Sequence, residues 1–317
     1  MKRKGIAELL EDFKAQGLQK KSRIDSYYTD DGELIELRKT LNGLVLEKLQ
    51  RSLSGEAEGD IDEKINILSA REQELAKQII KEPLFNCEKC QDTGLFNGKN
   101  CICLLEKLYV ECYGAMDIKS LGVSFDTFDL SVFDDSENLP GGKTQRSRMS
   151  EFLELAKLYL SEFPASIRKN LFITGKTGLG KSYLLYCMAA KAYLDGIDVM
   201  LIRATDLYDN FFLHRMGNDV DLSYLNDAAL LLIDDLGAEP STQNVTVEYL
   251  YDLLSYRMEN KKNTVVASNL TTIEELANKY DGRIASRLRS KKDFLAFNLV
   301  GSDLRMNLAK KKPDTTE

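Results

Sequence analysis

The stretch "NLFITGKTGLGKS", residues 170–182, decides the fold of this 317-residue chain. From Gly175 to Ser182 it satisfies the pattern G-x-x-x-x-G-K-[S/T], between an apolar run and a segment of helical periodicity. Glycines let such a loop wrap closely, so that its backbone N–H groups and the N-terminus of the following helix meet phosphate oxygens. The sequence therefore predicts a nucleotide phosphate loop between a strand and a helix.

Two side chains of this loop have expected roles in binding ATP. Lys181 is expected to reach the β- and γ-phosphates, and the Ser182 hydroxyl is expected to ligate Mg²⁺. The other loop residues are expected to surround the nucleotide: Gly175, Lys176, Thr177, Gly178, Leu179 and Gly180.

The apolar run "ALLLIDD", residues 229–235, predicts a buried strand that ends in two carboxylates. Parallel strands bring their C-terminal residues to the same edge of a sheet as the phosphate loop. Asp234 is expected to hold Mg²⁺, directly or through water, and Asp235 to polarise the attacking water. Glu239, four residues beyond Asp235, is a second candidate for orienting that water.

Further polar residues follow two later strands. The run "NTVVASN" ends in Asn269, whose neutral amide can fix a water near the γ-phosphate without adding repulsive charge. Beyond it, isolated arginines recur in "DGRIASRLRS" (residues 281–290) and "GSDLR" (residues 301–305). Arginines at such junctions can neutralise the charge that develops in phosphoryl transfer, from the same chain or from a neighbouring subunit. Chemistry alone does not favour a particular arginine.

The organisation of the chain follows from its alternating patterns. Short β-rich runs alternate with helical stretches over residues 149–312, which predicts an α/β domain with a parallel sheet covered by helices on both faces. Residues 313–317 are expected to form a tail. The Gly-, Ser- and charge-rich composition within residues 113–148 predicts a linker, and residues 1–112 are expected to form a separate N-terminal domain.

The N-terminal domain has the pattern of packed helices. Apolar residues recur at three-and-four spacing in residues 31–53 and again in residues 61–79, with the turn-forming sequence "SGEAEGD" between them. This pattern predicts two antiparallel helices. Such a pair is either a self-contained bundle or a docking surface for another protein, and the sequence does not separate the two.

Four cysteines lie in "CEKCQDTGLFNGKNCIC", residues 87–103, within a loop of about residues 84–105. Four thiolates at this spacing suit a tetrahedral Zn²⁺ with no open position for a catalytic water, so the predicted role is structural. A redox pair and unbound thiols are the alternatives. The C-x-C second half is less usual than a second C-x₂-C, which leaves Cys112 as a possible substitute ligand. The predicted zinc ligands are Cys87, Cys90, Cys101 and Cys103.

Composition and charge exclude some classes of protein. No apolar run reaches the roughly 18 residues that span a bilayer, and the N-terminus lacks the pattern of a secretory signal, so we expect a cytoplasmic protein. The net charge of −7 argues against coating nucleic acid through bulk charge. A local basic surface for single-stranded DNA is expected around Arg287, Arg289, Lys291 and Lys292.

The order "GKTGLGKS", "LLLIDDLGAE", "ASN", "RIASRLRS" and "GSDLR" resembles the AAA+ ATPase domain of bacterial replicative helicase loaders of the DnaC/DnaI type and of the related IstB-like transposition ATPases. "CEKCQDTG" and "SFDTFDLSVF" extend the resemblance to the loaders from about Glu82 to about Lys312.

The resemblance implies roles for individual residues. It matches Gly175–Ser182 to Walker A, Asp234 and Asp235 to Walker B, and Asn269 to sensor 1. Arg305 matches sensor 2, and Arg287 matches the arginine finger offered to the ATP of a neighbouring subunit, with Arg283 as the alternative. Many AAA+ proteins have Glu where this chain has the shorter Asp235, which implies a slow, switch-like ATPase.

The implied function is loading of the replicative hexameric helicase onto single-stranded DNA in replication initiation, with ATP binding and hydrolysis as the switch. An arginine finger acting between subunits also implies self-association in the ATP state. One rival is an IstB-like ATPase that acts with a transposase on duplex DNA. Another is a zinc-stabilised adaptor that binds ATP without significant hydrolysis.

Overall fold

The computed structural model describes residues 6–54, 60–79, 85–166, 169–240 and 246–305. The chain divides into two compact units. The smaller is Leu10–Cys101, and the larger is Ile102–Glu317 together with Met1–Leu9.

The larger unit is built on a parallel sheet, which has five strands in the part of the chain that the structure describes. The strand order is β4-β5-β6-β3-β7, so the strand before the phosphate loop, β3, and the strand that ends in the two aspartates, β5, flank β6. The near-continuous apolar runs arise because a parallel sheet is buried on both faces. The strands are β3 (Asn170–Thr174), β4 (Val199–Arg203), β5 (Leu230–Leu236), β6 (Asn263–Ser268) and β7 (Phe294–Asn298).

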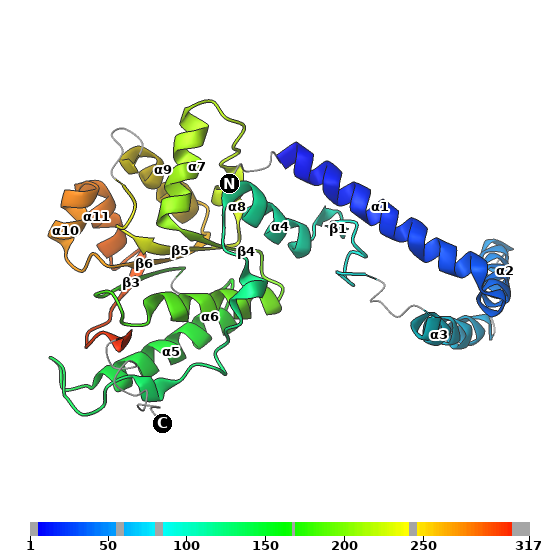
Figure 1. The fold of residues 1–317 in the computed structure, drawn as a ribbon, viewed down its shortest axis with the longest axis horizontal. Helices are drawn as coiled ribbons and strands as arrows, with labels where there is room; N and C mark the ends of the chain where they lie inside the picture. The colour runs from blue at the N-terminus through cyan, green and yellow to red at the C-terminus, as the bar shows by residue number, and fades with distance from the viewer. Residues whose placement is uncertain (1–5, 55–59, 80–84, 167–168, 241–245, 306–317) are drawn as a thin grey trace, which may run out of the picture. The chain divides into compact units, whose positions relative to one another are not determined.

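Helices cover both faces of this sheet. Helices α5 and α6 lie on one face, and α7, α9 and α11 lie on the other (Figure 1). The helices of the unit are α4 (Ile102–Tyr113), α5 (Gln145–Ser161), α6 (Lys181–Leu194), α7 (Ala204–Arg215), α8 (Ser223–Asp227), α9 (Thr246–Glu259), α10 (Ile273–Lys279) and α11 (Gly282–Arg289). The predicted α/β class with a helix-covered parallel sheet is confirmed.

Residues 113–148, which the sequence predicts to be a linker, pack on the core of the larger unit. They contain two 3₁₀ helices, η1 (Ile118–Leu121) and η2 (Leu130–Val132). The side chains of Ile118 and Phe133 are buried in the main hydrophobic cluster, and Phe125 and Phe128 pack against it. This differs from a linker because the aromatic residues among the Gly- and Ser-rich ones supply apolar surface that the core buries.

Helix α4 is fixed to the sheet by tyrosine hydroxyls. Tyr109 donates to Oδ1 of Asp198 at 2.8 Å, and Tyr113 donates to the carbonyl of Asp221. Asp198 also accepts from the backbone N–H of Ala229 at 3.4 Å, and burial raises the pKa of its carboxyl group. The helix that directly follows Cys101 is therefore a part of the larger unit.

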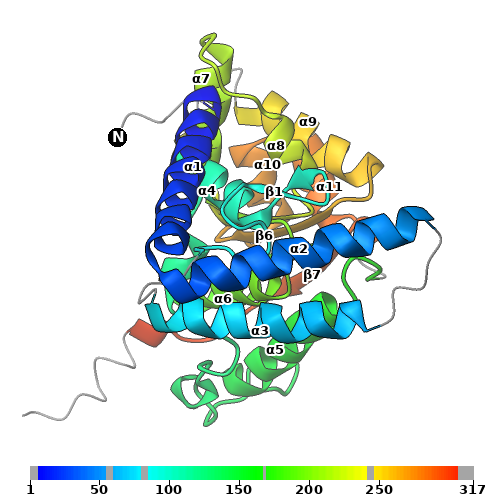
Figure 2. The ribbon, with the colours of Figure 1, turned by 90° about the vertical axis from the view of Figure 1, so that its right-hand side faces the viewer.

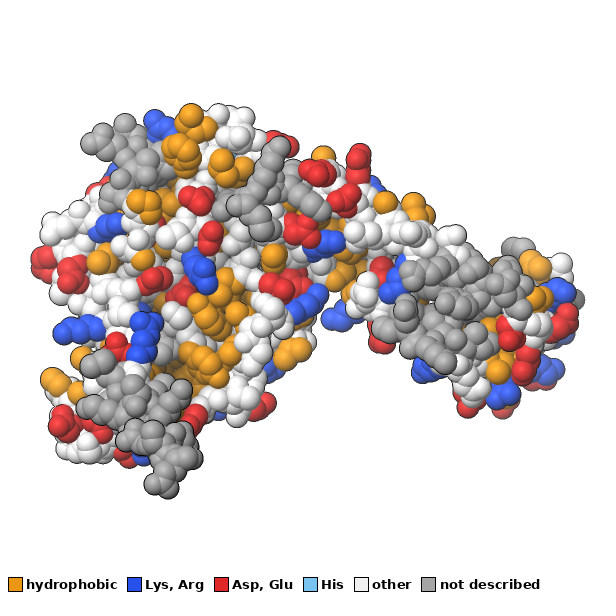
Figure 3. Space-filling view, in the orientation of Figure 1, with side chains coloured by type: hydrophobic (Ala, Val, Ile, Leu, Met, Phe, Trp, Pro, Cys, Tyr) orange, Lys and Arg blue, Asp and Glu red, His pale blue; other side chains and the backbone are white. Residues whose placement is uncertain are grey.

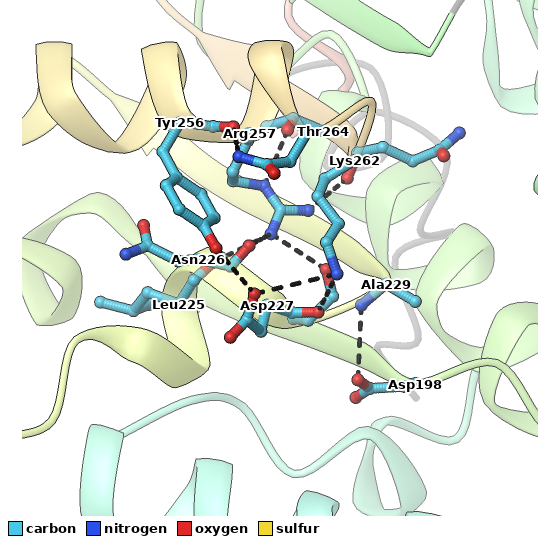
Figure 4. A network of polar contacts seen from close by, with 12 residues as sticks. Asp198, Leu225, Asn226, Asp227, Ala229, Tyr256, Arg257, Lys262 and Thr264 are labelled. Carbon is cyan, nitrogen blue, oxygen red and sulfur yellow. Dashed lines mark hydrogen bonds and ion pairs between the residues drawn. The ribbon is translucent and has the colours of Figure 1, made fainter.

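A fully buried arginine, Arg257 on α9, ties α8 to β6 (Figure 4). Its Nη1 donates to the carbonyls of Leu225, Asn226 and Ala228, each at 2.9 Å. Its Nη2 donates to the carbonyl of Asn263 at 2.6 Å, and its Nε donates to the hydroxyl of Thr264 at 3.0 Å. Carbonyls at a helix C-terminus lack intrahelical partners and carry partial negative charge, which suits a guanidinium group.

Among its described residues, the smaller unit contains three long helices and a short hairpin. Helices α2 (Gly32–Ser54) and α3 (Ile61–Ile79) lie side by side, as their spacing predicts (Figure 2). They follow α1 (Ile6–Asp30), and strands β1 (Leu95–Phe96) and β2 (Lys99–Asn100) pair antiparallel. In the described part of the chain, no helix combines the length and hydropathy needed to cross a bilayer.

Candidate functional site

The phosphate loop, the ends of β5 and β6, and the last described residues share one pocket of about 500 Å³. They meet there because parallel strands end at the same edge of the sheet. The pocket is lined by Thr177, Gly178, Leu179, Gly180, Lys181, Ser182, Tyr183, Asp235, Asn269, Leu304 and Arg305. Residues predicted from four separate motifs are therefore brought together.

The ammonium group of Lys181 is held at the mouth of the loop. Its Nζ donates to the carbonyls of Gly175 at 2.7 Å and Lys176 at 2.8 Å, and to Oδ1 of Asn269 at 2.7 Å. Burial lowers the pKa of Lys181, while the carboxylates of Asp235 and Asp234 raise it. The contact with Asn269 joins the phosphate loop to the end of β6.

Ser182 and Asp234 lie in contact below the loop. The Ser182 hydroxyl donates to Oδ1 of Asp234 at 3.0 Å, and the hydroxyl of Tyr186 donates to Oδ2 at 2.9 Å. Burial raises the pKa of Asp234, and burial together with the Asp234 carboxylate raises the pKa of Tyr186 to about 12, so the phenol stays protonated and donates. A hydroxyl and a carboxylate oxygen side by side are the hard ligands that Mg²⁺ prefers. These two residues fit the predicted magnesium site.

Asp235 occupies an unusual backbone conformation at the end of β5. Its φ is 56°, in the left-handed region, and the pairing of β5 with β6 shifts register between Ile233 and Leu236. The Nδ2 of Asn269 donates to Oδ1 of Asp235. A non-glycine residue with positive φ is uncommon and clusters at functional sites, where the surroundings enforce it. Here the bulge turns the second aspartate toward the pocket.

Glu239, the second candidate for orienting water, is engaged elsewhere. Its side chain is 1% exposed and does not line the nucleotide pocket. Oε1 accepts from the hydroxyl of Tyr280 at 2.6 Å, and Oε2 accepts from the N–H of Gly237 at 2.8 Å. The carboxylate therefore braces the loop after β5, and the geometry favours Asp235 for the water.

The segment 299–304 runs against the phosphate loop. The N–H of Leu299 donates to the carbonyl of Thr174 at 2.7 Å, and that of Leu304 donates to Gly178 at 3.0 Å. A Cβ atom at Gly175 would lie 2.6 Å from the Leu299 carbonyl oxygen, and one at Gly178 would lie 1.9 Å from the Asp303 carboxylate. The glycines are thus required by this close approach and by their positive φ angles, in addition to wrapping phosphate.

The two candidate arginine fingers lie outside the nucleotide pocket of their own chain. Arg287 borders a second pocket of about 550 Å³ and lies over the ring of Tyr251, 4.4 Å from its centroid. Its Nη2 donates to the Tyr251 hydroxyl at 2.8 Å. Arg283 lies over the same ring at 4.9 Å and pairs with Asp281 at 2.8 Å. Neither arginine lines the nucleotide pocket, and the arginine-finger role stays a prediction.

The predicted basic surface is only partly available for DNA. Arg287 is held by Tyr251, and Arg289 donates to the carbonyl of Thr271 and lies over the ring of Phe172. Lys291 and Lys292 are exposed. On the face shown in Figure 3, basic and acidic side chains are interspersed. The four residues therefore do not all face solvent as one cationic patch.

The sulfur atoms of Cys87, Cys90, Cys101 and Cys103 all lie within 4.8 Å of one another. Four sulfurs bound to one tetrahedral Zn²⁺ are about 3.8 Å apart, given Zn–S bonds of about 2.3 Å. The Cys87 and Cys101 sulfurs are 3.8 Å apart. The cluster therefore fits zinc, and its fourth member is Cys103 and not Cys112, which is buried further along α4.

Asp92 organises the loop that carries the first two cysteines. Its carboxylate accepts from the N–H groups of Asn86 at 3.0 Å and Cys87 at 2.7 Å, and from Nζ of Lys20 at 3.1 Å. A Cβ at Gly17 would lie 2.8 Å from the Asp92 carbonyl oxygen, so α1 approaches this loop closely. Hydrogen bonds of this kind, to groups that do not themselves bind the metal, orient the metal ligands.

We expect purified protein to contain one zinc per chain and Cys87→Ser to lose it, because three thiolates leave a tetrahedral site incomplete. Elemental analysis of anaerobic preparations measures the stoichiometry. Cys187→Ser is the matched control, since Cys187 is buried in α6 and outside the cluster. Wild-type protein without metal would contradict the assignment.

Sequence reasoning missed Tyr186 and Tyr251. Tyr186 lies four residues after Ser182 on α6, one helical turn along the same face, so the spacing could have indicated it. Tyr251 is on α9 and meets Arg287 from α11, and no local pattern indicates that contact.

Comparison with known proteins finds similarities for the larger unit. Residues 153–288 match the family model of the IstB-like ATP binding protein. A structure of DnaI aligns with a TM-score of 0.45 and 24% identity, over 58% of this chain and 95% of that one. A structure of the DnaC helicase loader aligns with a TM-score of 0.44 and 20% identity, over 56% and 98% of the two chains.

A structure of AMPPCP-bound DnaA from Aquifex aeolicus aligns with a TM-score of 0.44 and 19% identity over 54% of this chain. The alignment spans about half, 52%, of that chain. The match to residues 153–288, together with the phosphate-loop pocket on the parallel sheet, shows that this part of the chain is similar to IstB-like ATP binding proteins.

Proposed function

We propose that the protein is an ATP-dependent loader of the replicative DNA helicase onto single-stranded DNA. The proposal rests on the combination of two features in one chain. One is the pocket lined by the phosphate loop, and the other is a second compact unit of long helices with a four-cysteine cluster. The first part supplies a nucleotide switch, and the second supplies a surface for a protein partner.

The pocket supports ATP hydrolysis by positioning and charge. Lys181 holds the β- and γ-phosphates, and Asp235, fixed by Asn269, orients and polarises the attacking water. Arg305 contacts the γ-phosphate from the pocket wall. Ser182 and Asp234 would hold a Mg²⁺ ion, which would supply positive charge to neutralise the phosphates. The shorter reach of aspartate compared with glutamate makes this ATPase slow, as suits a switch.

The helical unit supports a docking role. Apolar side chains on α2 and α3 are exposed: Val45 by 43%, Leu46 by 61%, Leu49 by 55% and Ile67 by 61%. Apolar side chains gathered on a helix pair favour binding to another protein. We assign this surface to the hexameric helicase and the ATPase unit to single-stranded DNA.

A second candidate is a transposition ATPase that acts with a transposase on duplex DNA. It is favoured by the match of residues 153–288 to the IstB-like family. The cysteine cluster and the long helical unit favour the loader instead.

We expect the full-length protein to hydrolyse ATP, single-stranded DNA to change the rate, and Lys181→Ala to abolish hydrolysis, because Lys181 is the phosphate ligand of the loop. A steady-state phosphate-release assay measures this. Lys191→Ala is the matched control, since Lys191 lies on the same helix but pairs with Asp195 at the surface.

The partner is tested by affinity capture from the native cell with the full-length protein as bait, with ATP and with ADP. Recovery of a hexameric helicase supports the loader. Recovery of a transposase without the helicase contradicts it. Absence of hydrolysis, together with partner binding that survives Lys181→Ala, would identify an adaptor that does not turn over ATP.

A further inference from the structure

Gln145, the first residue of α5, holds the turn that precedes Arg305. Its side chain is buried, with 5% exposed. Nε2 donates to the Ser302 carbonyl at 3.0 Å, and Oε1 accepts from the Ser302 N–H at 3.1 Å and from its hydroxyl at 3.3 Å. One amide group thus binds both backbone polar groups of a residue 157 positions away in the sequence.

Gly301 allows this contact to form. Its φ is 144°, in the region that favours glycine, and a Cβ atom there would lie 2.2 Å from Cδ of Gln145. Any larger residue at position 301 must displace the Gln145 side chain. The glycine of "GSDLR" is therefore fitted to Gln145.

The other end of the same turn rests on the phosphate loop. The N–H of Leu304 donates to the Gly178 carbonyl at 3.0 Å, and the Asp303 carboxylate lies against the Cα of Gly178. Oδ1 of Asp303 accepts from the N–H of Arg305 at 2.9 Å. The turn is therefore held between α5 on one side and the phosphate loop on the other, and Arg305 extends from it into the pocket wall.

We propose that Gln145 is a positioning residue for Arg305, and through it for the discrimination of ATP from ADP. The inference rests on the proposed role of Arg305 at the γ-phosphate. The Arg305 side chain is exposed, so its position depends on its backbone. The backbone position is set by the hydrogen bonds of Gln145 and Leu304. A displacement of about 1 Å at such a group is enough to weaken its contact with phosphate strongly.

The residues on either side of Gln145 have partners other than the turn. A substitution of one of them can therefore test the stability of α5 without disturbing the contact between Gln145 and Ser302. Thr144 is the N-cap of α5 and accepts from the N–H of Ser147 at 3.1 Å. Nε of Arg146 donates to the carbonyls of Leu130 at 3.1 Å and Phe133 at 3.2 Å. Thr144→Ala is therefore a matched control that weakens the helix start without touching the turn.

The experiment titrates fluorescent ATP and ADP analogues, with Mg²⁺, into the full-length protein. We expect Gln145→Met, which keeps the length of the side chain and removes its hydrogen bonds, to weaken ATP binding by about 3- to 10-fold and ADP binding by less than about 2-fold. In an Arg305→Ala background the same substitution is expected to have little further effect, because the group it positions is gone. Gly301→Ala should weaken ATP binding in the same way, because the added Cβ atom displaces the Gln145 side chain.

Three results would overturn the inference: equal losses for ATP and ADP, equal effects of Gln145→Met with and without Arg305, or a loss matched by Thr144→Ala. If Gln145→Met does not fold, Gly301→Ala takes its place. Its effect on ATP and ADP binding is then compared between protein with Arg305 and protein with Arg305→Ala. A separate result bears on the proposed function: if Arg305→Ala alone leaves ATP affinity unchanged, the γ-phosphate role of Arg305 is wrong, whatever Gln145 does.

Discussion

Replacing Arg287 with alanine is expected to lower kcat for ATP hydrolysis by about 10³-fold and to leave the affinity for ATP unchanged. Arg287 does not line the nucleotide pocket of its own chain, so its loss removes no contact with bound ATP. It lies over the ring of Tyr251 and lines a different pocket. Arginines supplied between subunits neutralise charge that develops only in the transition state.

The measurement is hydrolysis as a function of protein concentration, because a residue that acts on a neighbour requires association. Mixing Arg287→Ala with Lys181→Ala protein tests the direction of action. The first retains a phosphate loop and the second retains an arginine, so a mixed assembly contains competent sites although neither variant alone does. Recovered activity in the mixture is the expected result.

Arg283→Ala is the matched control for this prediction, since Arg283 lies over the same tyrosine ring and pairs with Asp281 at the surface. Loss of activity in Arg283→Ala with normal activity in Arg287→Ala would transfer the role to Arg283. Weaker ATP binding in Arg287→Ala, or hydrolysis that is independent of protein concentration, would contradict an action between subunits.

Replacing Arg257 with methionine is expected to lower the free energy of unfolding of the ATPase unit by about 3–5 kcal/mol. The substitution keeps an unbranched side chain of similar length but leaves five acceptors without their donor, four of them buried. Burial lowers the pKa of Arg257 to about 10, which is still well above neutral, so the native side chain is charged. The free energy of unfolding of Arg257→Lys should lie between those of Arg257→Met and wild type, because one ammonium group cannot reach both α8 and β6.

Urea unfolding followed by tyrosine fluorescence measures this, since the chain has 14 tyrosines and no tryptophan. Lys157→Met is the surface control. Its Nζ pairs with Glu154 at the surface, and its removal should change the free energy of unfolding by less than about 1 kcal/mol. Equal stability of Arg257→Met and wild type would show that the network carries no net stabilisation.

The sequence predicts those parts of the site whose motif is contained in a single segment. The phosphate loop from Gly175 to Ser182 needs only its glycines, its lysine and the strand and helix beside it. Asp235 and Asn269 follow apolar runs, and the parallel arrangement of those runs brings both into the pocket. The spacing of the cysteines likewise predicts a cluster, and the four sulfur atoms do converge.

Two arrangements depend on contacts that no single segment of the sequence indicates. Glu239 is near Asp235 in sequence, but the chain turns at Gly237. The Glu239 carboxylate is therefore buried against Tyr280. Residues 113–148 have the composition of a linker, and their apolar residues pack nevertheless because the sheet offers a face to cover. The domain limits drawn from composition stay a prediction.

The sequence by itself determined the class of the fold, the position of the phosphate loop, and the carboxylate, amide and thiol groups that lie together in the pocket and in the cysteine cluster. It could do so because periodicity and motif spacing are properties of one segment at a time. Only the tertiary structure decided which groups meet: Gln145 with Ser302, Tyr186 with Asp234, and Arg287 with Tyr251. These contacts join different elements of the fold or residues a full helical turn from their motif. Their free energy depends on distance in space, which no local pattern records.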